Sequence, residues 1–219
     1  MTDEMILVVR RSLFEQLGKF QGLAFDVQRY LPALLTRENN FFTPRPAAET
    51  NFDLKQIIPY VLLVHNARVL HYVRGKKAGE QRLAAKGSVG IGGHMNNGET
   101  KDLFHEENAT YRTDALSDSW DEAAYLEGVR REVIEELNLQ SGFSNHIVAL
   151  LNDDSNPVGQ VHLGVVHIFK LDTDQVTKRE QMITQLEFLS HAELQARRDN
   201  LESWSQICVD NFGKLLEKI

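Results

Sequence analysis

The sequence predicts an α/β fold, because strand-like and helix-like patterns alternate along it. Ile57 to His65 and Arg68 to Arg74 are rich in Val, Ile, Leu and Tyr and are joined by Asn66-Ala67, as in a β-hairpin. Between Trp120 and Leu139 the apolar residues instead recur every three or four positions, as on one face of a helix. With 219 residues and 42% hydrophobic content, the chain can form one main domain with extensions.

The remaining elements follow from the same two periodicities. A helix is expected at Phe25 to Leu35, provided that Pro32 falls in its first turn. Further strands are expected at Met5 to Val9, Ser88 to Ile91, Ile147 to Leu151, Val161 to Leu171 and Leu186 to Leu189. Two helices, Ala192 to Arg198 and about 201–219, are expected to end the chain.

Apolar stripes predict which helix faces are buried. In the helix at 120–139 the stripe has spacings of three, four and four, and Ser119 or Asp121 can cap the helix start. Its members are Leu126, Val129, Val133 and Leu137. The stripe of the last helix consists of Leu201, Trp204, Cys208, Phe212, Leu215 and Ile219.

Composition narrows the classes of partner. The net charge of −7 and the lack of a basic stripe argue against a nucleic acid polymer as the partner. A phosphorylated small molecule would need metal ions to mask its charge. Cys208 is the single cysteine, which excludes an internal disulfide and a zinc thiolate cluster. The start, MTDEMILVVRR, is opposite in charge order to a secretory signal, and no apolar stretch approaches the length that spans a membrane. We therefore expect a cytoplasmic protein without a membrane partner.

Three carboxylates point to metal chemistry. Glu132, Glu135 and Glu136 stand at i, i+3 and i+4, so they fall within about a third of a helical turn. Their mutual repulsion is unfavourable unless a cation lies between them, and hard oxygen ligands suit Mg²⁺ or Mn²⁺. Taken alone, such a cluster is more often a solvated helix face.

A glycine-rich segment supplies the second half of the pattern. Gly90-Ile91-Gly92-Gly93-His94 follows a predicted strand, and glycines let the backbone approach a ligand more closely than any side chain permits. A glycine pair can equally serve a turn alone, and the His94 side chain can equally be structural.

Together these segments resemble the Nudix box, G-x5-E-x7-R-E-U-x-E-E-x-G-U, where U is a bulky aliphatic residue. Gly93 and Glu99 match its first part, and REVIEELNL from Arg131 to Leu139 matches its second. The likeness covers about residues 56–190. It implies a Nudix-type α/β/α sandwich with a mixed β-sheet over 56–219, an N-terminal extension 1–55 packed on that domain, and a C-terminal helix at about 201–219.

The chain departs from the box at two places. Glu99 and Arg131 are separated by 31 residues instead of seven, an excess of 24, and we expect the inserted loop at about 100–119. A loop tolerates this length because closure entropy grows only logarithmically with length. Deletion of much of 101–118 is therefore expected to keep the fold and metal binding and to alter substrate preference. Asn138 replaces the final glycine, and we expect it to adopt the left-handed conformation that asparagine tolerates after a helix.

The resemblance also implies roles for individual residues. The metal, Mg²⁺ or Mn²⁺, would be held by Glu132 and Glu136, by Glu135 directly or through water, and by the carbonyl of Gly92 or Gly93, with Arg131 orienting Glu132. The general base would be Glu132, or else Glu180, or less favourably Glu187. Weaker candidates for contact with substrate phosphates are Arg74, Lys76, Lys77, Lys86 and Glu99.

The implied activity is metal-dependent hydrolysis of a nucleoside diphosphate linked to another moiety. A non-catalytic Nudix-like regulator that binds nucleotide metabolites is an alternative, although such domains often lose box carboxylates. Isopentenyl-diphosphate isomerase would require a catalytic cysteine, and Cys208 lies on an apolar stripe. The aromatic residues Phe41, Phe42 and Phe52 could stack on a base, but packing on the sheet or in a homodimer is the favoured use.

Overall fold

A mixed β-sheet organises this computed structural model, which describes residues 4–74, 86–96, 121–179 and 183–219. In these ranges the sheet has nine strands, with the order β11-β5-β4-β9-β8-β2 along its main path. Strand β1 pairs with β4 and β3, and β6 pairs with β5. The pairing of β4 with β9 is parallel, whereas the other pairings are antiparallel.

The sheet consists of β1 (Met5–Arg10), β2 (Gly22–Ala24), β3 (Asn40–Pro44), β4 (Leu54–His65), β5 (Arg68–Arg74), β6 (Gly87–Ser88), β8 (Phe143–Asn152), β9 (His162–Leu171) and β11 (Ile183–Leu189). A second, two-stranded sheet pairs β7 (Leu137–Leu139) with β10 (Val176–Lys178). The helices are α1 (Arg11–Gly18), α2 (Val27–Leu34), α3 (Arg45–Ala48), α4 (Glu122–Glu136), α5 (Pro157–Gln160), α6 (His191–Ala196), α7 (Ser203–Asp210) and α8 (Phe212–Leu216), with a 3₁₀ turn η2 at Arg198–Asn200.

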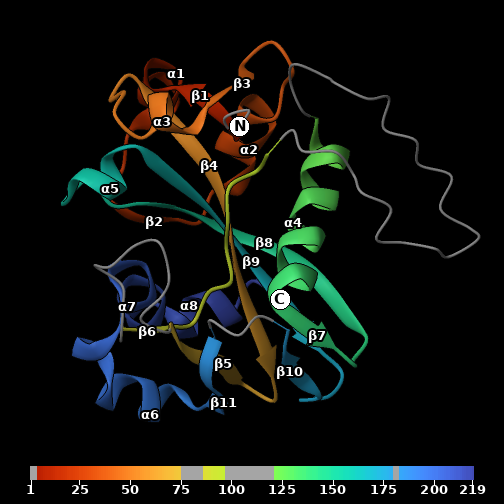
Figure 1. Ribbon diagram of the computed structural model, residues 1–219. Coiled ribbons are helices and arrows are strands. Elements are labelled where there is room, and N and C mark those ends of the chain that lie inside the picture. The colour runs from red at the N-terminus through yellow and green to blue at the C-terminus, as the bar shows by residue number, and fades with distance from the viewer. Residues whose placement is uncertain (1–3, 75–85, 97–120, 180–182) are drawn as a thin grey trace, which may run out of the picture.

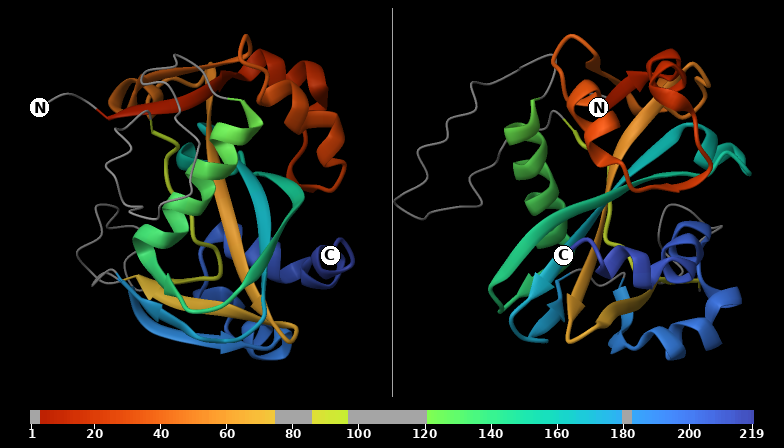
Figure 2. Two further views of the ribbon diagram at one scale, coloured as in Figure 1. Left: turned by 90° about the vertical axis from the view of Figure 1, so that its right-hand side faces the viewer. Right: turned by 180° about the vertical axis from the view of Figure 1, so that it is seen from behind.

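The central strand β4 supplies core residues to both faces of the sheet. Every residue from Leu54 to Val64 is buried, and side chains of a strand point alternately to its two faces. Val61 and Leu63 pack on the side of α4, whereas Leu62 and Val64 pack on the side of α7 and α8. Figures 1 and 2 show these helices on opposite faces of the sheet, so the predicted α/β/α architecture with a mixed sheet is confirmed.

The N-terminal segments belong to the same sheet. Strand β1 lies beside β4 with Val9 opposite Lys55, and β2 adds to the far edge with Leu23 opposite Leu151. The aromatic side chains of this region differ in burial. Phe41 and Phe42 pack against apolar clusters, as favoured from the sequence, whereas Phe52 is 50% exposed.

A buried lysine joins these N-terminal segments to the turn between β8 and β9. The Lys55 ammonium group is fully buried and donates to Asn152 Oδ1 at 2.6 Å, to Asp154 Oδ1 at 2.8 Å and to the Gly159 carbonyl at 3.0 Å. Burial lowers the pKa of Lys55, and the nearby carboxylate opposes that shift. Removal of one partner would leave a buried charge unpaired, which is strongly unfavourable. The contact therefore holds the turn between β8 and β9 against β4.

The C-terminal segment differs from the single long helix that was predicted. It is divided into α7 and α8 at Asn211, whose φ of −116° and ψ of 15° depart from helical values. The Asn211 side chain donates to the Ile207 carbonyl at 2.9 Å, which satisfies an acceptor left over at the end of α7. The predicted apolar stripe is nevertheless correct, since Cys208, Phe212 and Leu215 are all buried.

Two smaller predictions also need correction. Pro32 is the sixth residue of α2 instead of lying in its first turn, and the helix ends two residues later. The strand expected at 88–91 is limited to β6, after which Ile91 forms only an isolated bridge to Val61.

None of the helices in the described ranges is both long and apolar enough to cross a membrane.

A buried histidine links α4 to the sheet. Tyr125 Oη lies 2.9 Å from His167 Nε2, and Asn145 Oδ1 lies 2.9 Å from His167 Nδ1. A neutral imidazole satisfies both contacts, because Nδ1–H can donate to Asn145 while Nε2 accepts from Tyr125. Burial lowers the pKa of His167 to about 3, so the ring stays neutral in the folded protein through mild acid.

We therefore expect His167 to make the fold sensitive to acid. Below about pH 6.5 the unfolded chain binds a proton at this position and the folded chain does not, so stability is lost as pH falls towards 3. Between pH 7 and pH 5 the loss from this one group is on the order of 2 kcal/mol. Urea unfolding at both pH values should show that His167→Gln loses less stability on acidification than the wild type. His146→Gln, a change at a partly exposed histidine on β8, should behave as the wild type, and equal acid losses in all three proteins would contradict a neutral buried His167.

Candidate active site

Helix α4 begins at the capping residue that the sequence suggested. The Asp121 side chain accepts from the Ala124 amide at 3.0 Å, and Ser119, the alternative, lies outside the described residues. Val129, Val133 and Leu137 are fully buried, as predicted. Leu126 is only partly buried, and the unpredicted core residue is Tyr125, which precedes Val129 by one turn. This packing leaves Glu122, Glu127 and Arg130 exposed on the opposite edge of the helix.

The end of α4 corrects the expectation for Asn138. The chain leaves the helix at Leu137 with a φ of −131° and a ψ of 146°, and it continues directly into β7. Asn138 is therefore an extended strand residue opposite Thr177 and does not adopt the left-handed conformation. Pairing of β7 with β10 replaces the glycine turn that the family pattern suggested.

The glycine segment passes close to both the sheet and α4. A Cβ atom at Gly92 would lie 2.3 Å from the Pro59 carbonyl oxygen, and one at Gly93 would lie 2.0 Å from Glu132 Oε2. Both distances are far shorter than van der Waals contact, so a side chain cannot be added at either position without displacing a neighbour. The Glu132 carboxylate thus lies directly against the backbone of Gly93.

Glu132 is a largely buried carboxylate between α4 and this segment. Its side chain is 13% exposed, and Oε1 accepts from Arg131 Nη2 at 3.0 Å. Burial raises the pKa of Glu132 to about 7; the Arg131 charge opposes this shift, and the charges of Glu135 and Glu4 add to it. An elevated carboxyl pKa beside a glycine backbone is a feature of a functional site more than of a solvated helix face.

Arg131 lies between two of the predicted metal ligands. Besides its contact with Glu132, its Nε atom lies 3.6 Å from Glu135 Oε1, too far for a hydrogen bond, although that nitrogen is buried. Glu135 is 48% exposed. Arg131 therefore contacts both carboxylates, and its positive charge neutralises part of the negative charge on this face.

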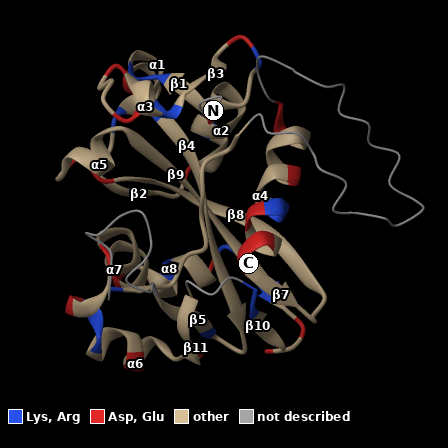
Figure 3. Ribbon diagram, in the orientation of Figure 1, with Lys and Arg blue, Asp and Glu red and all other residues tan. Residues whose placement is uncertain are grey.

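The three predicted carboxylates share one side of the helix without converging. Glu136 is partly buried, and its carbonyl accepts from the Arg179 amide at 2.9 Å. Among the residues described, no three His, Cys, Asp or Glu side chains are close enough to hold a metal ion. Figure 3 shows acidic and basic residues along α4.

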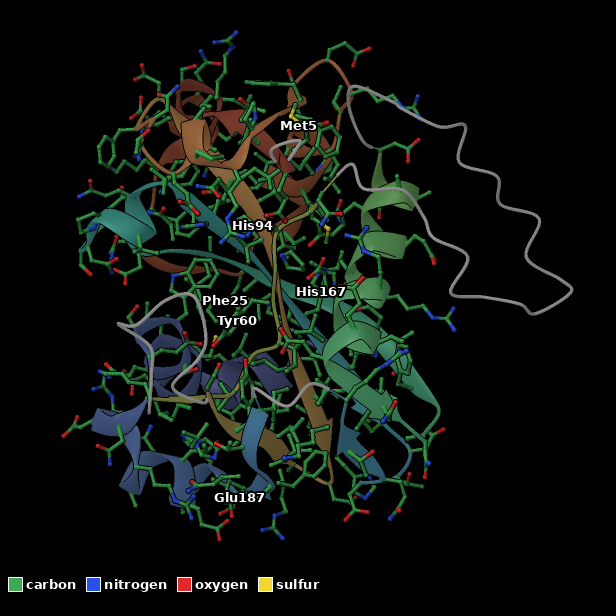
Figure 4. The ribbon with its side chains drawn as sticks, viewed as in Figure 1. Met5, Phe25, Tyr60, His94, His167 and Glu187 are labelled. Carbon is green, nitrogen blue, oxygen red and sulfur yellow. The ribbon has the colours of Figure 1, made fainter. Side chains whose placement is uncertain are left out.

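The other predicted site residues lie elsewhere or are not described. Glu187 is on β11, where it pairs with Arg197 at 2.5 Å, well away from His94 (Figure 4), which leaves it outside the site. Lys86 is exposed just before β6, and Arg74 ends β5 opposite Ile183. Four predicted residues, Lys76, Lys77, Glu99 and Glu180, lie outside the described ranges, as does the insert at about 100–119.

Two residues near the site were not assigned a role from the sequence. Glu4, the residue before β1, is close enough to contribute to the raised pKa of Glu132. His94 has a buried Nε2 without a hydrogen-bond partner, and its ring centroid lies 5.6 Å from that of His162. Burial, with the charge of Arg45 and the nearby His162, lowers the pKa of His94 to about 4, so it is neutral at pH 7. Periodicity gave no signal for Glu4, because it precedes the apolar run.

Comparisons with known proteins identify the family of the chain. No model of a known protein family matches the chain. Protein YmaB of Bacillus subtilis (strain 168) is 33% identical over 216 residues, covering 95% of this chain and 97% of YmaB. The crystal structure of Tm1382, a provisionally assigned Nudix hydrolase, superimposes with a TM-score of 0.70 at 25% identity, covering 95% of this chain and 98% of Tm1382. The chain therefore belongs to one family with YmaB and is a hydrolase of the Nudix superfamily, whose general reaction is pyrophosphate hydrolysis.

Proposed function

We propose that this protein is a divalent-metal-dependent hydrolase of a nucleoside diphosphate linked to another moiety. The observation that carries the proposal is the buried Glu132 carboxylate, whose Oε2 occupies the space that a side chain at Gly93 would fill. A carboxylate is rarely buried without a partner that compensates its charge, and Arg131 engages its Oε1 atom. Oε2, facing the glycine backbone, is then the atom best placed to meet a ligand.

The residues present fit Mg²⁺ or Mn²⁺. Glu132 and Glu136 are separated by one helical turn, and carboxylate and backbone carbonyl oxygens are the hard ligands that these cations prefer. In the proposed site these two residues would hold the metal, the carbonyl of Gly92 or Gly93 would add a further oxygen, and Glu135 would bind directly or through water. The i to i+4 spacing places the Glu136 side chain on the same side of the helix as Glu132.

Each chain residue then has a defined task. Arg131 holds Oε1 of Glu132 and so fixes the direction of Oε2. Glu132 is also the favoured general base, because its largely buried carboxylate lies against the glycine segment that would share the metal. A bound divalent cation supplies activation of a water molecule for attack on phosphorus and neutralises the charge that develops on the phosphate. Glu180 stays the alternative base.

The isomerase alternative lacks support. Cys208, the only cysteine, is 1% exposed on α7, on the face of the sheet opposite α4, and burial raises the pKa of its thiol. A thiol that is buried and protonated cannot act on a ligand at α4. The regulator alternative is disfavoured because all three box carboxylates are retained. A cytoplasmic location, the absence of a membrane or nucleic acid partner, and homodimer formation stay predictions.

The proposal predicts turnover that depends on the box carboxylates. The full chain with Mg²⁺ or Mn²⁺ should hydrolyse at least one compound in a panel of nucleoside diphosphate derivatives. Glu132→Gln and Glu136→Gln should each lower kcat by about two to four orders of magnitude, the range for loss of a group that acts on the reacting atoms. Glu127→Gln, on the exposed face of the same helix, is the matched control and should keep full activity. No turnover of any compound, or turnover that survives both substitutions, would sink the proposed mechanism.

The contact at Gly93 gives a second prediction. In Gly93→Ala the new methyl group would displace the end of the Glu132 side chain, which is flexible, and not the backbone. We therefore expect the free energy of unfolding to change by no more than about 1 kcal/mol, while Mn²⁺ affinity and kcat each fall about tenfold or more. Isothermal titration with Mn²⁺ and urea unfolding measure the two effects separately. Gly213→Ala places its methyl group in open space and should change neither, whereas an unaffected Gly93→Ala would show that this close approach has no role.

A further inference from the structure

We infer that Arg45 and Glu4 are positioning residues, which hold the glycine segment in register with Glu132 from the N-terminal part of the chain. The inference rests on the proposed metal site, and it assigns to the segment before β4 a part in forming that site. Neither side chain needs to touch the substrate or the metal. Their effect passes through the backbone between Gly92 and Asn96.

Backbone hydrogen bonding joins β1 to this segment. The Leu7 amide donates to the Met95 carbonyl at 2.7 Å, and Ile6 forms an antiparallel bridge with Asn96. The Met95 side chain is fully buried in the same apolar cluster as Leu7. The end of the glycine segment is therefore attached to β1 only two to three residues after Gly93.

Side chains reinforce this attachment at the start of β1. The Arg45 amide donates to the Glu4 carbonyl at 2.8 Å, and its guanidinium donates to Glu4 Oε2 at 3.0 Å and to Glu49 Oε1 at 2.8 Å. The other oxygen of Glu4 accepts from the Asn96 side chain at 3.5 Å, a long contact. Arg45 thus holds both the backbone and the carboxylate of Glu4. Glu4 in turn contacts Asn96, the last described residue after the glycine segment.

The position of Gly93 is then determined from both sides. On one side the Gly92 backbone lies against the Pro59 carbonyl of β4. On the other side the Met95 carbonyl accepts a hydrogen bond from the Leu7 amide of β1. Glu132 approaches Gly93 so closely that a shift of the backbone by a few tenths of an ångström would change where Oε2 lies. Residues that orient a metal ligand in this indirect way commonly affect metal affinity about 10–100-fold.

An electrostatic role for Arg45 predicts the opposite result. Arg45 offsets the charge of Glu4, and the charge of Glu4 reaches Glu132. If Arg45 acted only through its charge, its removal would leave this region more negative and would strengthen cation binding. If it acts by positioning, its removal weakens cation binding. The sign of the change in affinity therefore separates the two mechanisms.

The test is Mn²⁺ titration of the full chain, with kcat measured on any diphosphate that the wild type hydrolyses. Arg45→Met should weaken Mn²⁺ binding about tenfold and lower kcat, and Arg45→Lys should be impaired too, because an ammonium group cannot reproduce the guanidinium fork. The matched control is Arg198→Met: Arg198 is 37% exposed against 36% for Arg45, and it is paired with Asp210 at 2.6 Å on the far side of the fold. It should bind Mn²⁺ like the wild type.

A double-mutant cycle tests the route of the effect. If Arg45 acts through Gly93, Arg45→Met should add little to the loss of Mn²⁺ affinity already present in Gly93→Ala. Unchanged or tighter Mn²⁺ binding by Arg45→Met, or full additivity in the cycle, overturns the positioning role and leaves the proposed function standing. Absence of Mn²⁺ binding by the wild type overturns both, and absence of turnover with normal Mn²⁺ binding overturns only the proposed function.

Discussion

The close approach of Glu132 to the Gly93 backbone is the contact on which the site depends, because it joins two parts of the chain that are distant in sequence. Helix α4 supplies the carboxylate, and its position is set by burial of Val129 and Val133 and by the contact of Tyr125 with His167 on β9. The sheet supplies the glycine segment through the tight passage of Gly92 over Pro59. Gly93 and Glu132, one from each half of the box, therefore lie side by side.

The same contact explains why the first 55 residues matter to the site. Strand β1 lies beside β4 and also accepts the end of the glycine segment, so it supports the segment on the side that β4 leaves open. Lys55 ties the neighbouring part of β4 to the turn after β8 with a buried charge. These contacts make the N-terminal segments part of the sheet that carries the site.

The sequence was informative wherever a periodic pattern or a motif was decided by local geometry. The hairpin at Asn66-Ala67, the buried stripe of α4 and the burial of Cys208 all follow from spacing, and all are found in the structure. Asn138 and the break at Asn211 were missed, because pairing of β7 with β10 and capping at the end of α7 depend on contacts that spacing does not encode. The contribution of Glu4 and Arg45 was missed for the same reason, since it arises from strand pairing between β1 and a segment about 90 residues away.

A ligand of this site has to provide positive charge. Arg131 contacts both Glu132 and Glu135, so one positive charge lies beside two carboxylates. Burial raises the pKa of Glu132 to about 7.

The most direct measurement is a crystal structure of the full chain with Mn²⁺ and a non-hydrolysable nucleoside diphosphate derivative, with the metal located by anomalous scattering. We predict a Mn²⁺ peak within coordination distance of Glu132 Oε2 and of the Gly92 or Gly93 carbonyl oxygen. A diphosphate bound with no metal at Glu132, or a metal bound only elsewhere, would contradict the central claim.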